Sequence, residues 1–186
     1  MNKVKREEIL DYVTYDEQRN EIRAAALEQK KPRRIHLGDY LTFLFENHDT
    51  IRYQVLEMVR VERIVKEADI QHELDTYNEL LGGPGQLGCS LLIEIETEEE
   101  RNVKLTQWLP LMQHLYLETD DGTRVRPVYD ERQVGDTRLS SVQYLKFDCG
   151  GRKPVALGSD FNLLECRVEL TEVQKTALNQ DIADAG

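Results

Sequence analysis

The pattern of apolar and polar positions is most informative between residues 40 and 81, which read YLTFLFENHDTIRYQVLEMVRVERIVKEADIQHELDTYNELL. Leu41, Phe43 and Phe45 recur at every second position, which is typical of a strand with one buried face. A polar cap, a long helix and a second helix capped by Asp69 are expected to follow. We expect the rest of the fold to be organised around this stretch.

Helices are also expected on both sides of this stretch. A short helix is predicted over residues 5–12, and the capping box over residues 14–17 should open a longer helix that Pro32 ends. Two further capping boxes, over residues 97–100 and 171–174, predict an internal helix and a C-terminal helix.

Short apolar or alternating runs predict strands over residues 35–37, 91–95, 115–119, 123–129, 142–147, 155–157 and 164–170. The pair Asp121-Gly122 is a strong hairpin signal, and Pro127 is expected on an edge strand because it cannot donate a ladder hydrogen bond. The sequence therefore predicts the α+β class: one domain over residues 1–186, with N-terminal helices packed on a mainly antiparallel β-sheet and a C-terminal helix.

On the long helix, which is expected to extend to about Ala68, polar side chains interrupt the apolar stripe. At 100° per residue the stripe comprises Ile51, Val55, Met58, Val61, Val65 and Ala68. Gln54 and Glu62 fall within this stripe, and Glu57 lies on its border. A buried carboxylate costs several kcal/mol unless it is paired, so we expect Glu62 and Glu57 to have partners.

Two interpretations of these polar positions remain open. In the simpler one, an internal ion pair or hydrogen bond ties the long helix to the sheet. In the other, the helix lies over a polar pocket, and one of the carboxylates acts as an acid, a base or a ligand while an arginine holds an anion. The candidate ligand-binding residues are Tyr53, Gln54, Glu57, Arg60 and Glu62.

Composition and charge narrow the classes of function. The chain has 186 residues, of which 40% are hydrophobic and 32% charged, as expected for one globular domain. Its net charge of −11 opposes binding to nucleic acid or to anionic lipid. The basic run over residues 30–34 is expected to close a helix, with a phosphate contact as the alternative. Three separated cysteines, no apolar run of bilayer length and no signal peptide predict a soluble, cytoplasmic protein with buried thiols.

No motif in the sequence predicts a cofactor or a metal site. Residues 83–88 have the spacing GxGxxG, but a helix precedes them and a strand follows, which is the reverse of a dinucleotide fingerprint. Asp69 and His72 resemble half of a di-iron motif, yet no second copy exists, so capping or solvated roles are expected for them. The catalytic residues, if there are any, stay unknown at this stage.

Residues 43–64, FLFENHDTIRYQVLEMVRVERI, resemble the signature of a bacterial domain-of-unknown-function family numbered thirty-five hundred and one. The opening VKREEIL, the strand LLIEIE and the closing RVELT are also similar to that family. The resemblance thus covers nearly the whole chain. Residues 159–162 read SDFN, where a histidine–proline pair is expected in this family.

The resemblance implies no established activity. It does imply a gene neighbourhood that contains rubrerythrin and heterodisulfide-reductase-like iron–sulfur proteins. The expectation is therefore an accessory or binding partner of such a protein in a redox or peroxide-defence system, itself without the four cysteines that an iron–sulfur cluster needs. The alternative is a small-molecule-binding enzyme that uses the polar pocket at the long helix. A homodimer is compatible with either.

Overall fold

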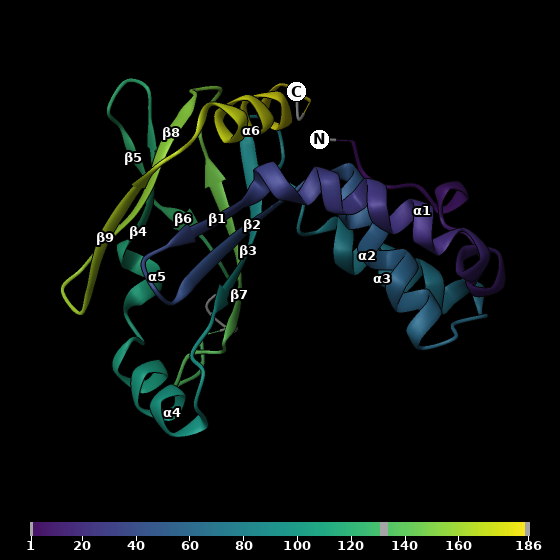
Figure 1. The fold of residues 1–186 in the computed structure, drawn as a ribbon, viewed down its shortest axis with the longest axis horizontal. Coiled ribbons are helices and arrows are strands. Elements are labelled where there is room, and N and C mark those ends of the chain that lie inside the picture. The colour runs from purple at the N-terminus through teal and green to yellow at the C-terminus, as the bar shows by residue number, and fades with distance from the viewer. Residues whose placement is uncertain (1, 131–133, 185–186) are drawn as a thin grey trace.

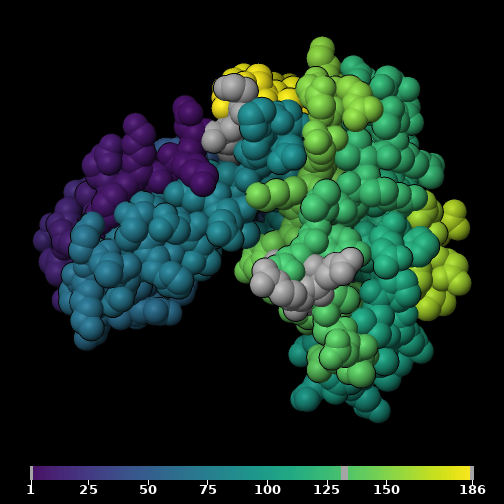
Figure 2. All heavy atoms as spheres, turned by 180° about the vertical axis from the view of Figure 1, so that it is seen from behind, coloured from purple at the N-terminus to yellow at the C-terminus, as the bar shows by residue number. Residues whose placement is uncertain are grey.

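The computed structural model describes residues 2–130 and 134–184 and contains two hydrophobic cores. One core lies among helices that project to one side of the molecule, and the other lies between two β-sheets (Figures 1 and 2). We call these parts the helical lobe and the β-lobe. The helical lobe comprises the 3-10 helix η1 (Arg6–Glu8), α1 (Tyr12–Lys30), α2 (His48–Val61) and α3 (Glu67–Asn78).

The β-lobe contains a five-stranded sheet of order β1-β2-β3-β7-β6 and a four-stranded sheet of order β5-β4-β8-β9. Every strand pairing within them is antiparallel. The first sheet consists of β1 (Arg34–Leu37), β2 (Leu41–Glu46), β3 (Gln86–Ile93), β7 (Val142–Asp148) and β6 (Pro127–Val128). The second consists of β5 (Arg124–Val125), β4 (Leu115–Thr119), β8 (Pro154–Phe161) and β9 (Leu164–Glu169).

Four short or peripheral helices complete the β-lobe: η2 (Lys31–Arg33), α4 (Glu98–Gln107), α5 (Leu111–His114) and α6 (Glu172–Asp184). The C-terminal helix α6 lies at the end of the sheets nearest the helical lobe, and α4 lies at the opposite end (Figure 1). The α+β class with antiparallel sheets and a C-terminal helix is confirmed. Within the described residues, no helix is both long and apolar enough to cross a bilayer.

The alternating pattern of β2 is confirmed. Phe43 and Phe45 are buried, as is Leu41, and Phe45 packs against Phe147 of β7 with ring centroids 6.1 Å apart. Because side chains alternate between the two faces of a strand, these residues all reach the core between the sheets. The even positions Thr42 and Leu44 therefore face the other side of this sheet.

The strand expected over residues 123–129 is divided between the sheets. β5 pairs with β4 in the second sheet, whereas β6 pairs only with β7 in the first. Pro127 accordingly lies on an edge strand, as predicted, because an edge position needs no ladder donor from the proline nitrogen.

The helix α1 starts before the capping box that was predicted over residues 14–17. Only a 3-10 turn forms within residues 5–12, and α1 begins at Tyr12 with Asp11 as its N-cap. The Asp11 carboxylate accepts from the amides of Val13 and Thr14, and the Thr14 hydroxyl donates to the same carboxylate at 2.6 Å. Thr14 is therefore a donor to the cap and cannot be the cap itself.

The long helix is shorter than the sequence indicated. α2 ends at Val61 rather than near Ala68, because the backbone reverses in a left-handed turn with Arg63 at φ 50°. The Ile64 amide donates to the Val59 carbonyl at 2.9 Å, which satisfies an otherwise unpaired carbonyl at the helix end. α3 then starts with Lys66 at its N-cap position, so Asp69 is not the cap.

The early end of α2 changes its buried face. The buried residues of the helix are Thr50, Ile51, Val55, Leu56 and Val59, whereas Val61 and Val65 are exposed. Beyond Val61 the chain is no longer helical, so successive residues do not advance by 100° each. The expected apolar stripe therefore does not continue past the end of α2.

A buried ion pair lies at the junction of the two lobes. Arg33, between α1 and β1, donates from Nε to Asp181 of α6 at 2.7 Å and from Nη2 at 2.8 Å. Burial raises the pKa of the Asp181 carboxyl above its ordinary value, against the opposing effect of the Arg33 guanidinium. The basic run over residues 30–34 thus contributes an internal contact at Arg33, and the preferred interpretation of helix closure holds for Lys30, the last residue of α1.

We predict that Arg33→Met lowers the free energy of unfolding by about 3–5 kcal/mol, because it leaves the Asp181 carboxylate buried without a partner. The double variant Arg33→Met/Asp181→Leu should recover most of this loss, since it removes both charges. Urea denaturation of the three proteins measures the difference. A double variant as unstable as the single one contradicts this explanation.

Candidate functional site

Glu57 of α2 is completely engaged by α1. Its Oε1 accepts from the Tyr15 hydroxyl at 2.6 Å and from Arg19 Nε at 2.7 Å, and its Oε2 accepts from Arg19 Nη2 at 3.0 Å. Burial raises the pKa of Glu57, but the hydrogen bonds from Arg19 and Tyr15 outweigh it and lower the pKa below the ordinary value. Glu57 therefore has the partners that the sequence required, although they come from a helix and not from the sheet.

Of the other four candidate residues, Arg60 is close enough for its charge to help lower the pKa of Glu57, but none of the four hydrogen-bonds Glu57 within the described residues. Lys30 lies over the Tyr53 ring at 5.0 Å, and Gln54 hydrogen-bonds Tyr77 of α3. Glu62 was expected in the apolar stripe, but it is exposed because α2 ends one residue before it. Of these residues, Tyr53, Arg60 and Glu62 line three separate hollows.

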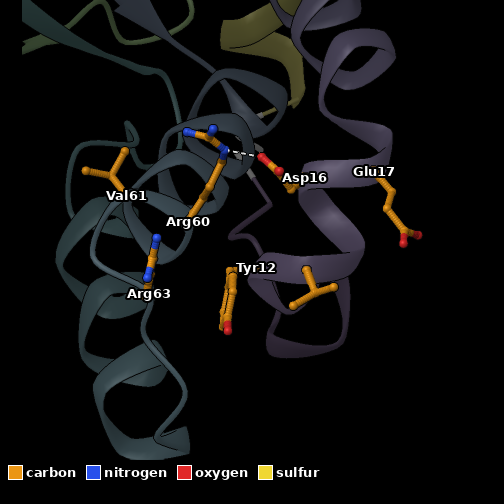
Figure 3. A pocket seen from close by; sticks show the side chains of 7 residues that line it. Tyr12, Asp16, Glu17, Arg60, Val61 and Arg63 are labelled. Atoms are coloured by element: carbon orange, nitrogen blue, oxygen red, sulfur yellow. Dashed lines mark hydrogen bonds and ion pairs between the residues drawn. The ribbon is translucent and has the colours of Figure 1, made fainter.

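A groove of about 560 Å³ lies between the start of α1 and the end of α2 (Figure 3). We call it the α1–α2 groove. It is lined by Tyr12, Val13, Asp16, Glu17, Arg60, Val61 and Arg63. Of the candidates from the sequence, only Arg60 belongs to it.

The antiparallel packing of α1 and α2 explains which residues meet in the groove. One step along α2, from Glu57 to Arg60, is matched by one step back along α1, from Arg19 to Asp16. Arg63, two residues beyond the end of α2, lines the same groove as Tyr12 and Val13 of the first turn of α1. Because residues three or four apart share one face of a helix, the Glu57 contact fixes which side chains line the groove.

The two arginines of the groove differ in their partners. Arg60 Nε lies 2.5 Å from Asp16 Oδ1 in an exposed ion pair, drawn as a dashed line in Figure 3. Among residues 2–130 and 134–184, the Arg63 guanidinium has no hydrogen-bond or ion-pair partner. The Glu17 carboxylate points away from both arginines (Figure 3). The groove therefore carries, at Arg63, one positive charge that no ion pair within the described part of the chain neutralises.

Arg63 also occupies a backbone conformation that suits glycine better. Among the described residues it is the only non-glycine residue with a positive φ. A side chain in the left-handed region crowds its own carbonyl, so glycine usually takes this position after a helix. No neighbouring contact of the guanidinium offsets this cost within the described part of the chain.

Two exposed valines share the groove with these charges. The side chains of Val61 and Val13 are 66% and 52% exposed. A single exposed valine is ordinary, but two that line one groove beside an unpaired guanidinium form a mixed apolar and cationic surface. Such a surface is typical of a protein–protein contact more than of a small-molecule cavity, which is enclosed.

A second polar cluster lies on the outer face of the first sheet. The Thr42 hydroxyl donates to Glu94 and lies 2.8 Å from His36 Nδ1. Since its only proton goes to the carboxylate, Thr42 accepts from His36, and the imidazole cannot act as its base. This cluster is therefore not arranged for nucleophilic catalysis.

Two of the three cysteines are buried. Burial raises the pKa of Cys89, and it raises the pKa of Cys149 to about 12, so both thiols are protonated at neutral pH. Because the thiolate is the nucleophile, neither cysteine is reactive in this conformation. Within the described residues, no group of three or more His, Cys, Asp or Glu side chains could hold a metal ion.

We predict that Glu57→Gln lowers the free energy of unfolding at pH 7 by about 2 kcal/mol, because it weakens hydrogen bonds to a charged group. The folded-state pKa is below the ordinary value of 4.5, so the contribution is full above that pH and is lost as the pH falls through the lowered pKa. Urea denaturation between pH 3 and 7 should show the two proteins converging in acid. A constant difference contradicts this assignment.

We also predict that Arg63→Gly raises the free energy of unfolding by about 1 kcal/mol, since glycine adopts the left-handed conformation without steric cost. Arg63→Ala is the matched control, because it removes the guanidinium and keeps the Cβ atom, and it should not stabilise. Thermal and urea denaturation measure both changes. Destabilisation by the glycine would show that the arginine side chain supports the fold.

Comparison with known proteins gives a family and a structural relative. The family model described as "Protein of unknown function (DUF3501)" matches residues 3–182. The crystal structure of a novel protein of unknown function from Burkholderia pseudomallei K96243 is similar to the chain, with 28% sequence identity, a TM-score of 0.88, and coverage of 97% of this chain and 100% of that one. No curated protein matches. The resemblance of residues 43–64 is thereby confirmed, and the chain belongs to the bacterial DUF3501 family.

Proposed function

We propose that this protein is a non-catalytic accessory protein that binds a protein partner through the α1–α2 groove. The observation that carries the proposal is the Arg63 guanidinium, which has no hydrogen-bond or ion-pair partner among residues 2–130 and 134–184 and lines the groove with two exposed valines. A side chain that is disfavoured by its backbone and unused within the fold is explained if its contact is made outside the chain.

The position of the groove supports this role. α1 ends and α2 begins at the junction with the β-lobe, so the start of α1 and the end of α2 lie at the far end of the helical lobe (Figure 1). At 1.5 Å per residue, the 14 residues of α2 extend about 20 Å from that junction. A partner can thus reach the groove without meeting the sheets.

The proposed partner is a rubrerythrin or an iron–sulfur protein of a redox or peroxide-defence system in the cytoplasm. The support for this identity is the gene neighbourhood that the family resemblance implies. The chain has only three cysteines, so it is proposed to dock onto the electron carrier and not to carry electrons through a four-cysteine cluster.

A small-molecule enzyme that uses Glu57 as acid or base has less support. Both oxygens of the Glu57 carboxylate already accept hydrogen bonds from α1, and its pKa is lowered, away from the value that general catalysis near pH 7 requires.

The test uses biolayer interferometry with purified candidate partners, namely a rubrerythrin and an iron–sulfur protein of the kind that the family resemblance implies. We predict that at least one of them binds the native protein and that Val61→Glu weakens this binding at least tenfold, because it places a charge in the apolar part of the contact. Val173→Glu is the matched control, since Val173 is 68% exposed and lies on α6, outside the helical lobe.

Two results would contradict the proposed function. One is the absence of binding to both candidate partners at micromolar concentration. The other is equal binding by the native protein and Val61→Glu, with circular dichroism showing that both are folded.

A further inference from the structure

We propose that the α1–α2 groove recognises an acidic segment of its protein partner, in which a carboxylate side chain stands next to an aliphatic one. The inference rests on the proposed function and adds the chemistry of the ligand: the carboxylate binds the Arg63 guanidinium, and the aliphatic side chain packs between Val13 and Val61.

The charges of the groove favour an acid over a base. Asp16 is already neutralised by Arg60, and Glu17 points away from the arginines, so the side of the groove formed by α2 has an excess of positive charge. A guanidinium presents several N–H donors in a planar fork that matches the two oxygens of a carboxylate. A basic segment would place its charge against the unpaired Arg63, which is unfavourable.

The apolar side chains specify the neighbour of that carboxylate. Val61 precedes Arg63 by two residues, Val13 lies on the facing helix, and both line the groove together with Arg63. An aliphatic residue of the partner would remove both valines from water. A burial of this kind stabilises the complex without a directional requirement, whereas the ion pair supplies the orientation.

Arg60 is poised to contribute a second contact. Its pair with Asp16 is exposed at Asp16 and half-buried at Arg60, and solvent-accessible ion pairs contribute little to stability, so the pair can exchange for a contact with a partner carboxylate. Asp16 then competes with the ligand for Arg60. Removal of the Asp16 charge should therefore strengthen binding of an acidic segment, which is the opposite of its effect on a basic one.

Because the whole chain is strongly acidic, its preference for an acidic segment has to come from a local contact. A protein of net charge −11 repels an acidic partner at long range, so steering by the overall field would select basic segments. Selection of acidic segments would accordingly require the short-range contact with Arg63, and it would disappear when that single guanidinium is removed.

The experiment selects random dodecapeptides displayed on phage with the full-length native protein as bait. The selected peptides are expected to be enriched in Asp or Glu beside Leu, Ile or Val. One selected peptide is then synthesised with a fluorescent label and titrated by fluorescence polarisation. Arg63→Gly should weaken its binding at least tenfold although the fold is more stable, Arg63→Lys should weaken it less, and Asp16→Asn should strengthen it severalfold.

Arg34→Gln is the matched control, because Arg34 is an exposed arginine of β1 outside the helical lobe. It should leave the titration unchanged. Enrichment of basic or uncharged peptides, the absence of enrichment, or equal binding by the native protein and Arg63→Gly would each overturn the inference. A native homodimer that dissociates with Arg63→Gly would assign the groove to a second copy of the chain and overturn it as well.

The proposed function and this inference fail in different ways. If a purified partner binds and Val61→Glu weakens it while Arg63→Gly does not, the docking surface stands and the acidic ligand is wrong. If acidic peptides bind in the groove and neither candidate partner does, the ligand chemistry stands and the redox partner is wrong.

Discussion

The contact of Glu57 with Tyr15 and Arg19 determines the geometry of the helical lobe. It fixes a carboxylate of α2 against two donors on α1 and thereby sets the alignment of two antiparallel helices. Burial and the bond to Glu57 raise the pKa of Tyr15, so its hydroxyl keeps the proton that it donates. Apolar packing alone would tolerate a shift along the helix axis, whereas this contact does not. The groove beyond Arg60 and Asp16 follows from that alignment.

The junction between the lobes also contains an ion pair between a carboxylate and a guanidinium, and this pair is more deeply buried. Arg33 and Asp181 are almost completely buried, and Arg33 also donates to Gln29, near the end of α1. An ion pair at such a place adds little net stability over apolar packing, but it penalises every arrangement in which either charge is left alone. This ion pair lies at the junction of the two lobes. The penalty therefore favours one orientation of the helical lobe relative to the β-lobe.

The sequence was a reliable guide where a local pattern has one physical meaning. The alternation in β2, the capping box at Thr171 and the proline at the edge of the first sheet all have a direct local cause, and the structure contains each of them. The need of Glu57 for a partner was also predictable, because the cost of a buried carboxylate does not depend on the fold. Its actual partners on α1 were not, since helix pairing is a long-range property.

The position of Glu62 was predicted less well than the fold, and the reason is one residue. An arginine at φ 50° ends α2, although the sequence signal for such an end is normally glycine. The sequence pattern indicated a helix that extends past Val61, and it therefore placed both Val61 and Glu62 in a buried apolar stripe. Both residues are exposed. The groove residues Tyr12, Val13 and Asp16 were not among the candidates, because the pairing of α1 with the end of α2 is a long-range property that no local pattern indicates.

We infer that Arg63 keeps its unfavourable backbone conformation because its guanidinium contacts a partner outside the chain. Nuclear magnetic resonance of protein labelled with 15N resolves the Nε–H signals of arginine side chains and follows them as a partner is added. We predict that the Arg63 Nε–H signal shifts and sharpens together with the amides of Val61 and Val13, while the Arg19 Nε–H signal stays unchanged because its bond to Glu57 persists. Shifts confined to the β-lobe, with an unperturbed Arg63 signal, would contradict it.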